Sequence, residues 1–158
     1  MKTFVSCDPG MGGAWARIIV PEQGENHVEA WDMPKTERDL ADLVRNLEKG
    51  LSVKGLIERV HSMPAQGIVS AWKFSGNYHG CRMAMICAGL SFDEVTPQAW
   101  QKFLGISPRK KTETKVQHKN KLKAKAQQLF PNIKVTLANA DALCLAEYLR
   151  RISSPQAL

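Results

Sequence analysis

Three carboxylates lie where the sequence predicts strands to end or a helix to begin. Asp8 follows an apolar strand at 3–7 and precedes a glycine-rich turn, Glu58 ends an apolar strand at 53–58, and Asp141 lies in the first turn of a helix predicted over 138–152. If the two strands are adjacent and parallel, the three carboxylates meet at one point. Like charges held close together repel, and divalent cations relieve that repulsion. The sequence therefore predicts a metal site formed by Asp8, Glu58 and Asp141.

This set of ligands favours phosphodiester chemistry. Ligation by oxygen alone, without a neighbouring histidine, favours magnesium or manganese over zinc. Two such ions, about 4 Å apart, can activate water and stabilise the leaving oxygen. Each acid also has a structural explanation, because Asp-Pro-Gly is a common turn, Glu58 could be solvated at the sheet edge, and Asp141 could interact with the helix dipole.

Positive charge is concentrated in residues 109–125, which hold eight basic residues against the single acid Glu113. The segment's net charge of +7 equals that of the whole chain. Such a stretch is typical of a surface that binds a polyphosphate, although a solvated lysine-rich helix is the alternative. The candidate DNA-binding residues are Arg109, Lys110, Lys111, Lys115, Lys119, Lys121, Lys123 and Lys125.

The elements that must position these residues follow from periodicity and turn signals. Strands are predicted at 3–7, 14–20, 27–31, 53–58 and 92–95. Helices are predicted from Thr36 to Gly50, over 67–89, from Thr96 to Leu104, over 115–129 and over 138–152. This order predicts an α/β fold with a five-stranded mixed sheet flanked by helices. The helix over 67–89 has glycines that suggest close approach to another backbone, which makes it the candidate dimer contact.

Length and composition set the remaining expectations. With 158 residues, 44% hydrophobic and 23% charged, we expect one globular domain over 1–158. No apolar run reaches the ~20 residues of a membrane helix and the start lacks a signal-peptide pattern, so we expect a cytoplasmic protein without membrane contact. Four scattered cysteines indicate neither a zinc site nor a disulfide framework.

Five blocks together carry a resemblance that covers nearly the whole chain. They are Asp8-Pro-Gly-Met-Gly-Gly-Ala14, Asp32-Met33-Pro34, the stretch from Ile57 to Gly67, Val95-Thr96-Pro97-Gln98-Ala99-Trp100, and Ala140-Asp141-Ala142-Leu143 through Ala146-Glu147-Tyr148. In this order they resemble the phage RuvC-like Holliday junction resolvases of the RNase H-like superfamily. The resemblance implies an RNase H-like fold and a crossover junction endodeoxyribonuclease. Such an enzyme is a homodimer that binds a four-way DNA junction and nicks two strands symmetrically.

The resemblance also implies roles for individual residues. Asp8, Glu58 and Asp141 match the family's catalytic acids. His61 stands in the loop where the bacterial enzymes use an aromatic residue that probes the junction centre, which implies stacking on DNA, although an exposed loop residue without special duty is the alternative. The bacterial motif has a further carboxylate three residues before the last acid, where this chain has Ala138. His118 or Glu113 is a candidate to fill that gap.

Three other functions are compatible with part of this pattern. A junction-binding protein without catalysis would keep the basic segment and lose the acids. An RNase H-like nuclease acting on flaps or RNA–DNA hybrids would keep both. An actin-type ATPase or sugar kinase shares the fold but needs a second glycine-rich phosphate loop and a much longer chain, and the sequence has neither.

Overall fold

The computed structural model describes residues 1–50, 52–60 and 67–154. Its centre is a five-stranded sheet of order β3-β2-β1-β4-β5. Antiparallel pairing joins β1 to β2 and β2 to β3, whereas β1 with β4 and β4 with β5 are parallel. The predicted five-stranded mixed sheet is therefore confirmed. The strands are β1 (Lys2–Asp8), β2 (Ala14–Val20), β3 (His27–Asp32), β4 (Val53–Glu58) and β5 (Phe92–Val95).

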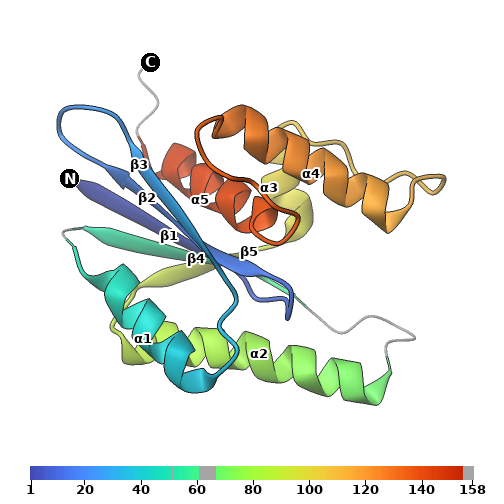
Figure 1. Ribbon diagram of the computed structural model, residues 1–158, viewed down its shortest axis with the longest axis horizontal. Coiled ribbons are helices and arrows are strands. Elements are labelled where there is room, and N and C mark those ends of the chain that lie inside the picture. Colours follow the sequence, from blue (N-terminus) through green and yellow to red (C-terminus); the bar gives the residue numbers. More distant parts are fainter. Residues whose placement is uncertain (51, 61–66, 155–158) are drawn as a thin grey trace.

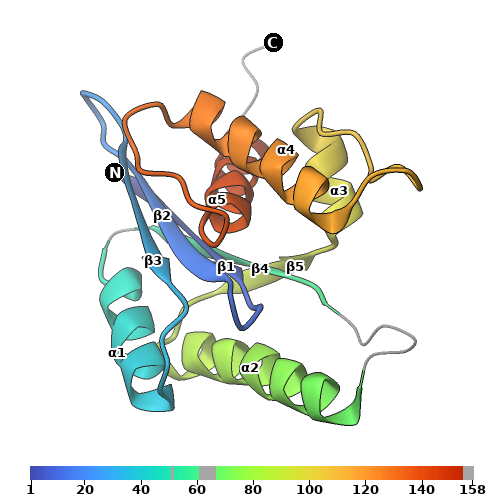
Figure 2. The same ribbon diagram turned by 45° about the vertical axis from the view of Figure 1, so that its right-hand side comes forward.

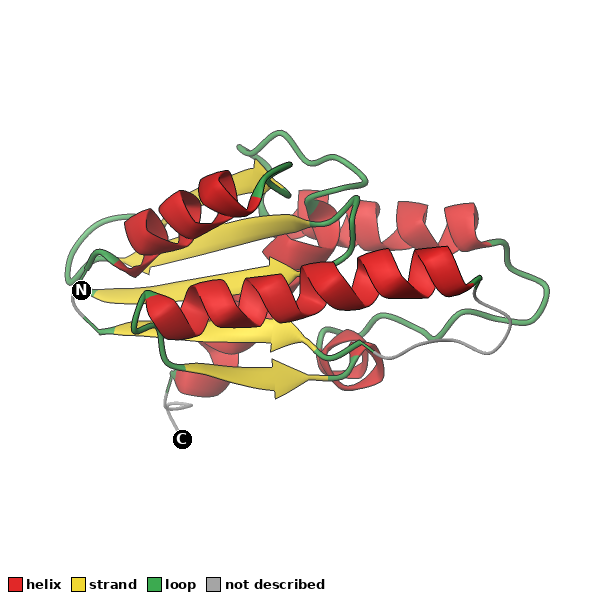
Figure 3. Cartoon of the chain, turned by 90° about the horizontal axis from the view of Figure 1, so that it is seen from below, coloured by secondary structure: helices red, strands yellow, loops and turns green. Residues whose placement is uncertain are grey.

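Helices cover both faces of the sheet. Figure 2 shows α1 (Glu37–Glu48) and α2 (Ile68–Cys87) below the sheet, and α3 (Pro97–Phe103), α4 (Lys115–Leu129) and α5 (Ala140–Ser153) above it. The same division is visible in Figure 1. Seen from the α1 and α2 side, the strands lie next to one another behind these two helices (Figure 3). Each face of the sheet therefore has its own hydrophobic core.

The alternation along β1 decides which side chains meet α5. Phe4 belongs to the core shared with α5, whereas Val5 and Cys7 belong to the core on the α1 and α2 side. Between them, Ser6 is buried and its hydroxyl donates a 2.6 Å hydrogen bond to the carbonyl oxygen of Ala142. This bond ties the first turn of α5 to β1, because a buried hydroxyl requires a partner. The next residue in the same phase is Asp8, so its side chain is on the α5 face.

Threonine caps begin three of the helices, and the sequence predicts two of them, Thr36 and Thr96. The hydroxyls of Thr36, Thr96 and Thr114 each accept a hydrogen bond from the backbone amide three residues later. At Thr114 the bond is reciprocal, since the side chain of Gln117 accepts from the Thr114 amide. The carboxyl end of α2 is followed by Gly89, whose φ of +75° favours glycine. These local signals explain why most predicted boundaries agree with the structure.

The start of α5 differs from its prediction. The helix begins at Ala140 rather than at 138. Thr136 and Asn139 exchange two hydrogen bonds, of 2.8 Å from the Thr136 amide to the Asn139 side chain and 3.1 Å from the Asn139 amide to the Thr136 hydroxyl. This pairing closes a turn ahead of the helix. Ala138 therefore lies in the turn and not on a helical face shared with Asp141.

The outer face of α2 is apolar and solvent-exposed. Ile68, Trp72, Met83 and Ile86 lie about one turn apart or at multiples of a turn, and are 88%, 81%, 54% and 55% exposed. The helix instead packs on the sheet through Cys81 and Met85. A Cβ atom at Gly76 would meet nothing within 4 Å, so no backbone of the described chain approaches that glycine. This face of α2 has no partner within the described residues.

None of the described helices combines the length and the apolar character that crossing a membrane requires.

Candidate functional site

Two of the three predicted acids are brought together by the parallel pairing of β1 and β4. Cys7 pairs with Ile57 in the register of these strands, so Asp8 and Glu58 are the next residues along. Asp8 is in phase with Ser6 and Glu58 with Leu56, which places both side chains on the face covered by α5. Asp141 lies in the first turn of α5. The structure therefore gathers all three acids at the carboxyl end of the central strands.

The electrostatics of the three acids are coupled. Burial is the main cause that raises the pKa of Glu58 to about 8, and the charges of Asp8 and Asp141 add to it. Burial, followed by the charge of Asp8, raises the pKa of Asp141 to about 7. The pKa of Asp8 is also raised by burial, against the amide of Gly10 and the charge of Lys119, which lower it. All three side chains keep some exposure, so a ligand can reach them.

Trp100 supports Glu58 from below the surface. Its indole Nε1 donates a 2.8 Å hydrogen bond to Oε2 of Glu58, and the ring is fully buried in the core between the sheet and α5. This bond fixes one carboxylate oxygen and lowers the pKa of Glu58 against the effect of burial. The sequence pattern alone does not predict this role for Trp100. The available signal was general, because a buried tryptophan usually places its N–H against an acceptor.

The turn between β1 and β2 is built closely around Asp8. The amide of Gly10 donates a 3.1 Å hydrogen bond to Oδ1 of Asp8. A Cβ atom at Gly13 would lie 2.2 Å from the carbonyl oxygen of Asp8, so only glycine fits there. From α2, the side-chain amide of Asn77 donates to the carbonyl oxygen of Pro9 at 2.6 Å. The turn that holds Asp8 is therefore fixed to the helix layer on the opposite face.

The donor chemistry of the three acids fits a hard divalent cation. Their ligating atoms are carboxylate oxygens, and their mutual repulsion raises the free energy of the ionised site, which a cation would offset. As they stand, no three His, Cys, Asp or Glu side chains among the described residues are arranged closely enough to hold a metal ion.

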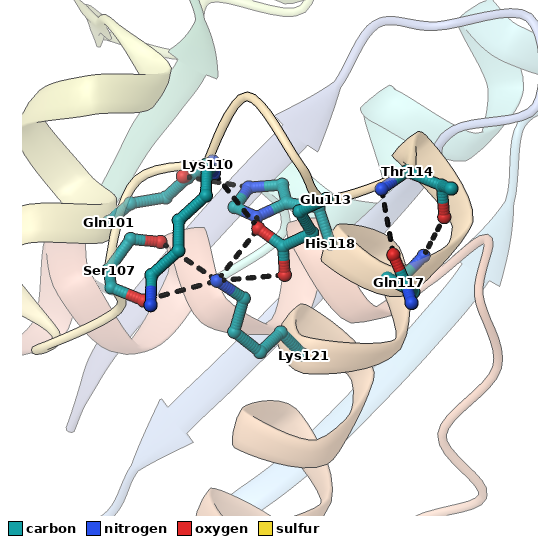
Figure 4. A network of polar contacts seen from close by, with 8 residues as sticks. All are labelled: Gln101, Ser107, Lys110, Glu113, Thr114, Gln117, His118 and Lys121. Atoms are coloured by element: carbon teal, nitrogen blue, oxygen red, sulfur yellow. Dashed lines mark hydrogen bonds and ion pairs between the residues drawn. The ribbon is translucent and has the colours of Figure 1, made fainter.

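Neither candidate for the missing fourth acid joins this cluster. Glu113 accepts hydrogen bonds from Nζ of Lys121 at 3.1 Å and from the amide of Lys110 at 3.2 Å. His118 Nε2 lies 3.3 Å from Oε1 of Gln101, and its Nδ1 lies 3.7 Å from Glu113 (Figure 4). Neither residue is among the groups that shift the pKa values of the three acids. Both belong instead to a network that joins α3, the following loop and α4.

The eight basic candidates are not equally available to a ligand. The exposed ones are Arg109, Lys110, Lys111, Lys115 and Lys119, while Lys121, Lys123 and Lys125 are partly buried. Lys121 is paired with Glu113. Lys119 lowers the pKa values of all three acids, so it is the lysine that links the basic segment to them. His61, the remaining candidate, lies outside the described residues.

Comparison with known proteins reveals similarity in the structure but not in the sequence. No family model and no curated protein matches this chain. A solved structure of Thermus thermophilus RuvC matches with a TM-score of 0.62 and 14% identity, covering 95% of this chain and 96% of that one. The chain has a RuvC-like fold.

A second match is T. thermophilus RuvC in complex with a Holliday junction substrate, with a TM-score of 0.63 and 14% identity. It covers 97% of both chains. At this identity the likeness is one of fold, and it confirms the predicted α/β RNase H-like class. The likeness in fold extends over nearly the full length of this chain.

Proposed function

We propose that this RuvC-like chain is a metal-dependent endonuclease that cleaves four-way or otherwise branched DNA by phosphodiester hydrolysis. The observation that carries the proposal is the cluster of Asp8, Glu58 and Asp141, three partly exposed carboxylates beside Lys119. Burial raises the pKa of all three, and the charge of Asp8 raises those of Glu58 and Asp141 further. Holding like charges close together costs free energy. Strongly perturbed pKa values therefore cluster at active sites, where this cost serves catalysis. A protein of the same fold has been solved with a Holliday junction substrate, which supports the choice of substrate.

In this proposal the three acids hold magnesium or manganese, with two ions in each site. Such ions activate the attacking water and stabilise the leaving oxygen. The hydrogen bond from Trp100 holds one oxygen of Glu58 in a fixed orientation and lowers the pKa of Glu58, which partly offsets the effect of burial. Lys119 supplies a positive charge beside the acids. The glycine turn after Asp8 leaves room for a phosphate, since a Cβ atom at Gly12 would meet nothing within 4 Å.

The basic segment supplies the DNA-binding surface in this proposal. Its exposed cations continue from Lys119, beside the acids, to the loop at 109–111. Contacts with phosphates release counterions, so binding is expected to weaken steeply as the salt concentration rises. His61 is proposed to contact DNA, as the resemblance implies. The whole of 1–158 is proposed to act as one nuclease domain.

Two symmetric nicks require two active sites, and we propose that a second copy of the chain covers the outer face of α2. Ile68, Trp72, Met83 and Ile86 form an exposed apolar stripe along this helix. The open space at Gly76, midway along the stripe, would let a second backbone approach closely. An isologous pairing of the stripe with itself would bury these side chains. Large exposed apolar patches commonly mark such protein–protein contacts.

The dimer is tested by two matched isoleucine variants. Ile86→Gln changes the stripe at a residue that is 55% exposed, and Ile152→Gln changes a residue of α5 that is 49% exposed. We expect the wild type and Ile152→Gln to sediment as dimers at micromolar concentration, and Ile86→Gln to shift towards monomer. A wild type that stays monomeric with and without junction DNA would refute the dimer.

The nuclease is tested with four labelled substrates: a four-way junction, a flap, a linear duplex and an RNA–DNA hybrid. We expect magnesium- or manganese-dependent, paired nicking of the junction. Asp8→Asn, Glu58→Gln and Asp141→Asn are each expected to abolish cleavage and to keep junction binding. Asp93→Asn, at an exposed carboxylate on β5, is the control and is expected to cleave as the wild type does.

Each other outcome of this assay has a definite meaning. Wild-type nicking by any one of the three acid variants would remove that residue from the proposed site. Binding without cleavage under any divalent metal would favour a junction-binding protein. Preferred cleavage of the hybrid or the flap would favour a different RNase H-like nuclease.

A further inference from the structure

A cavity of about 740 Å³ opens beside the basic segment, and the proposed cleavage chemistry does not use it. Its walls come from α3, the loop that follows α3, and His118 of α4. Pro97, Ile106 and Pro108 supply apolar surface, and Gln98, Gln101 and His118 supply hydrogen-bonding groups. A volume of this size is typical of sites that hold small, partly apolar ligands with a few fixed polar contacts.

Two residues of the cavity lining are next in sequence to residues that act on the acid cluster. Gln101 is the neighbour of Trp100, whose indole bonds to Glu58. His118 is the neighbour of Lys119, whose charge acts on all three acids. This adjacency along α3 and α4 supports placing a nearby nucleotide at the cavity when a phosphate of the same strand lies at the acids.

The walls are held in place before any ligand binds. His118 and Gln101 join α4 to α3 through a 3.3 Å contact. Nζ of Lys121 reaches the hydroxyl of Ser107 at 3.1 Å and also Glu113, so the loop is fixed to α4 (Figure 4). Preorganised polar groups make binding less costly, because few side chains lose freedom when a ligand enters.

The chemistry of the cavity suits a planar, hydrogen-bonding ring attached to a phosphate chain. The two glutamine amides can bond to the edge of such a ring, while the imidazole, the prolines and Ile106 contact its face. Burial lowers the pKa of His118, so its ring is uncharged at neutral pH. Lys102 and Arg109 are exposed at the cavity lining, where they can pair with phosphates on either side.

We propose that this cavity, the base pocket, binds one unstacked nucleobase of the DNA strand that is being cleaved. The proposal rests on the proposed nuclease function and adds a means of choosing substrates. Removing a base from a continuous duplex costs a few kcal/mol of stacking and pairing, whereas an unpaired base at a branch point costs little. The base pocket would therefore favour branched over linear DNA.

The test measures equilibrium binding of the Asp8→Asn protein to a series of four-way junctions. Each junction carries a single abasic site at one of the positions around the cleavage point. A base in the pocket is expected to contribute about fivefold or more to affinity, the lower part of the range for bases stacked on proteins. We expect one or two adjacent positions on one strand to lose this factor, and all other positions to stay within about twofold of the intact junction.

Matched variants then assign the effect to the pocket. Gln98→Leu combined with Gln101→Leu removes both amides from its wall. Gln127→Leu combined with Gln128→Leu removes two glutamines from the last turns of α4, outside the pocket lining. We expect the abasic penalty to fall by at least half in the first variant, in the Asp8→Asn background, and to be unchanged in the second.

Failure of this proposal can be told apart from failure of the nuclease proposal. Equal affinity for every abasic junction would overturn the base pocket while junction binding still stands, and so would an unchanged penalty in a folded Gln98/Gln101 variant. If that variant does not fold, as judged by thermal melting, the abasic series on the Asp8→Asn protein decides alone. Absence of any junction binding would overturn both proposals.

Discussion

Removing one of the clustered acids is expected to stabilise the metal-free protein. Glu58→Gln replaces a carboxyl whose pKa is raised from 4.5 to about 8 by burial and by the charges of Asp8 and Asp141. The amide keeps the size of the side chain, and its oxygen can still accept the hydrogen bond from Trp100. The variant therefore removes the buried negative charge of Glu58 and keeps the size and the hydrogen bond of the side chain.

The magnitude follows from linkage. Raising a pKa from 4.5 to about 8 corresponds to a free energy of about 5 kcal/mol, at 1.36 kcal/mol for each tenfold change. Between these two values the unfolded chain loses its proton while the folded protein keeps it. The free energy of unfolding of the wild type therefore falls as pH rises from about 4.5 to about 8, by up to 1.36 kcal/mol per pH unit from Glu58 alone. Asp141, with a pKa of about 7, adds to this loss.

The assay is urea unfolding in the presence of a chelator at pH 5, 6, 7 and 8.5. We expect the free energy of unfolding of Glu58→Gln to match that of the wild type at pH 5 and to exceed it by about 2–5 kcal/mol at pH 8.5. Each kcal/mol raises the melting temperature by roughly 2–4 °C. Magnesium at pH 8.5 should then stabilise the wild type more than the variant, because ligand binding favours the folded state.

The control is Glu25→Gln, at an exposed glutamate in the loop between β2 and β3. It is expected to follow the wild type at every pH. Equal stability of Glu58→Gln and the wild type at pH 8.5 would refute the reasoning, since it would mean that burial and the neighbouring acids do not raise the pKa of Glu58 in the folded state.

Four further variants test the surroundings of the acids. Trp100→Phe removes the hydrogen bond that lowers the pKa of Glu58, so the midpoint of the pH–rate profile for cleavage should move to higher pH; an unmoved midpoint would contradict this. Glu113→Gln removes a negative charge but should weaken junction binding, as measured by fluorescence anisotropy, because Glu113 holds the basic loop in place. Tighter binding would show that only its charge matters. Lys119→Gln and Lys123→Gln should each flatten the slope of log affinity against log salt by up to about one unit, and only Lys119→Gln should also slow cleavage at neutral pH.

Local chemistry in the sequence is sufficient to predict much of this protein. The alternation of Phe4, Ser6 and Asp8 identifies one face of β1, and the threonine caps at 36 and 96 locate two helix starts. These features depend on neighbours two to four residues away, so they are visible in the chain itself. The clustering of the three acids could be predicted because the parallel pairing of β1 with β4 leaves one geometry for Asp8 and Glu58.

What the sequence left open depends on contacts between distant residues. Periodicity shows that α2 has an apolar stripe, but only the packing of α2 through Cys81 and Met85 shows that the stripe is exposed. Trp100 and Glu58 are 42 residues apart, and nothing local indicates that they share a hydrogen bond. The pKa values of the acids likewise depend on burial by α5 and on the position of Lys119. The sequence by itself determined which side chains are available, and the tertiary structure decided which of them meet, because burial and long-range electrostatics exist only once the elements have packed.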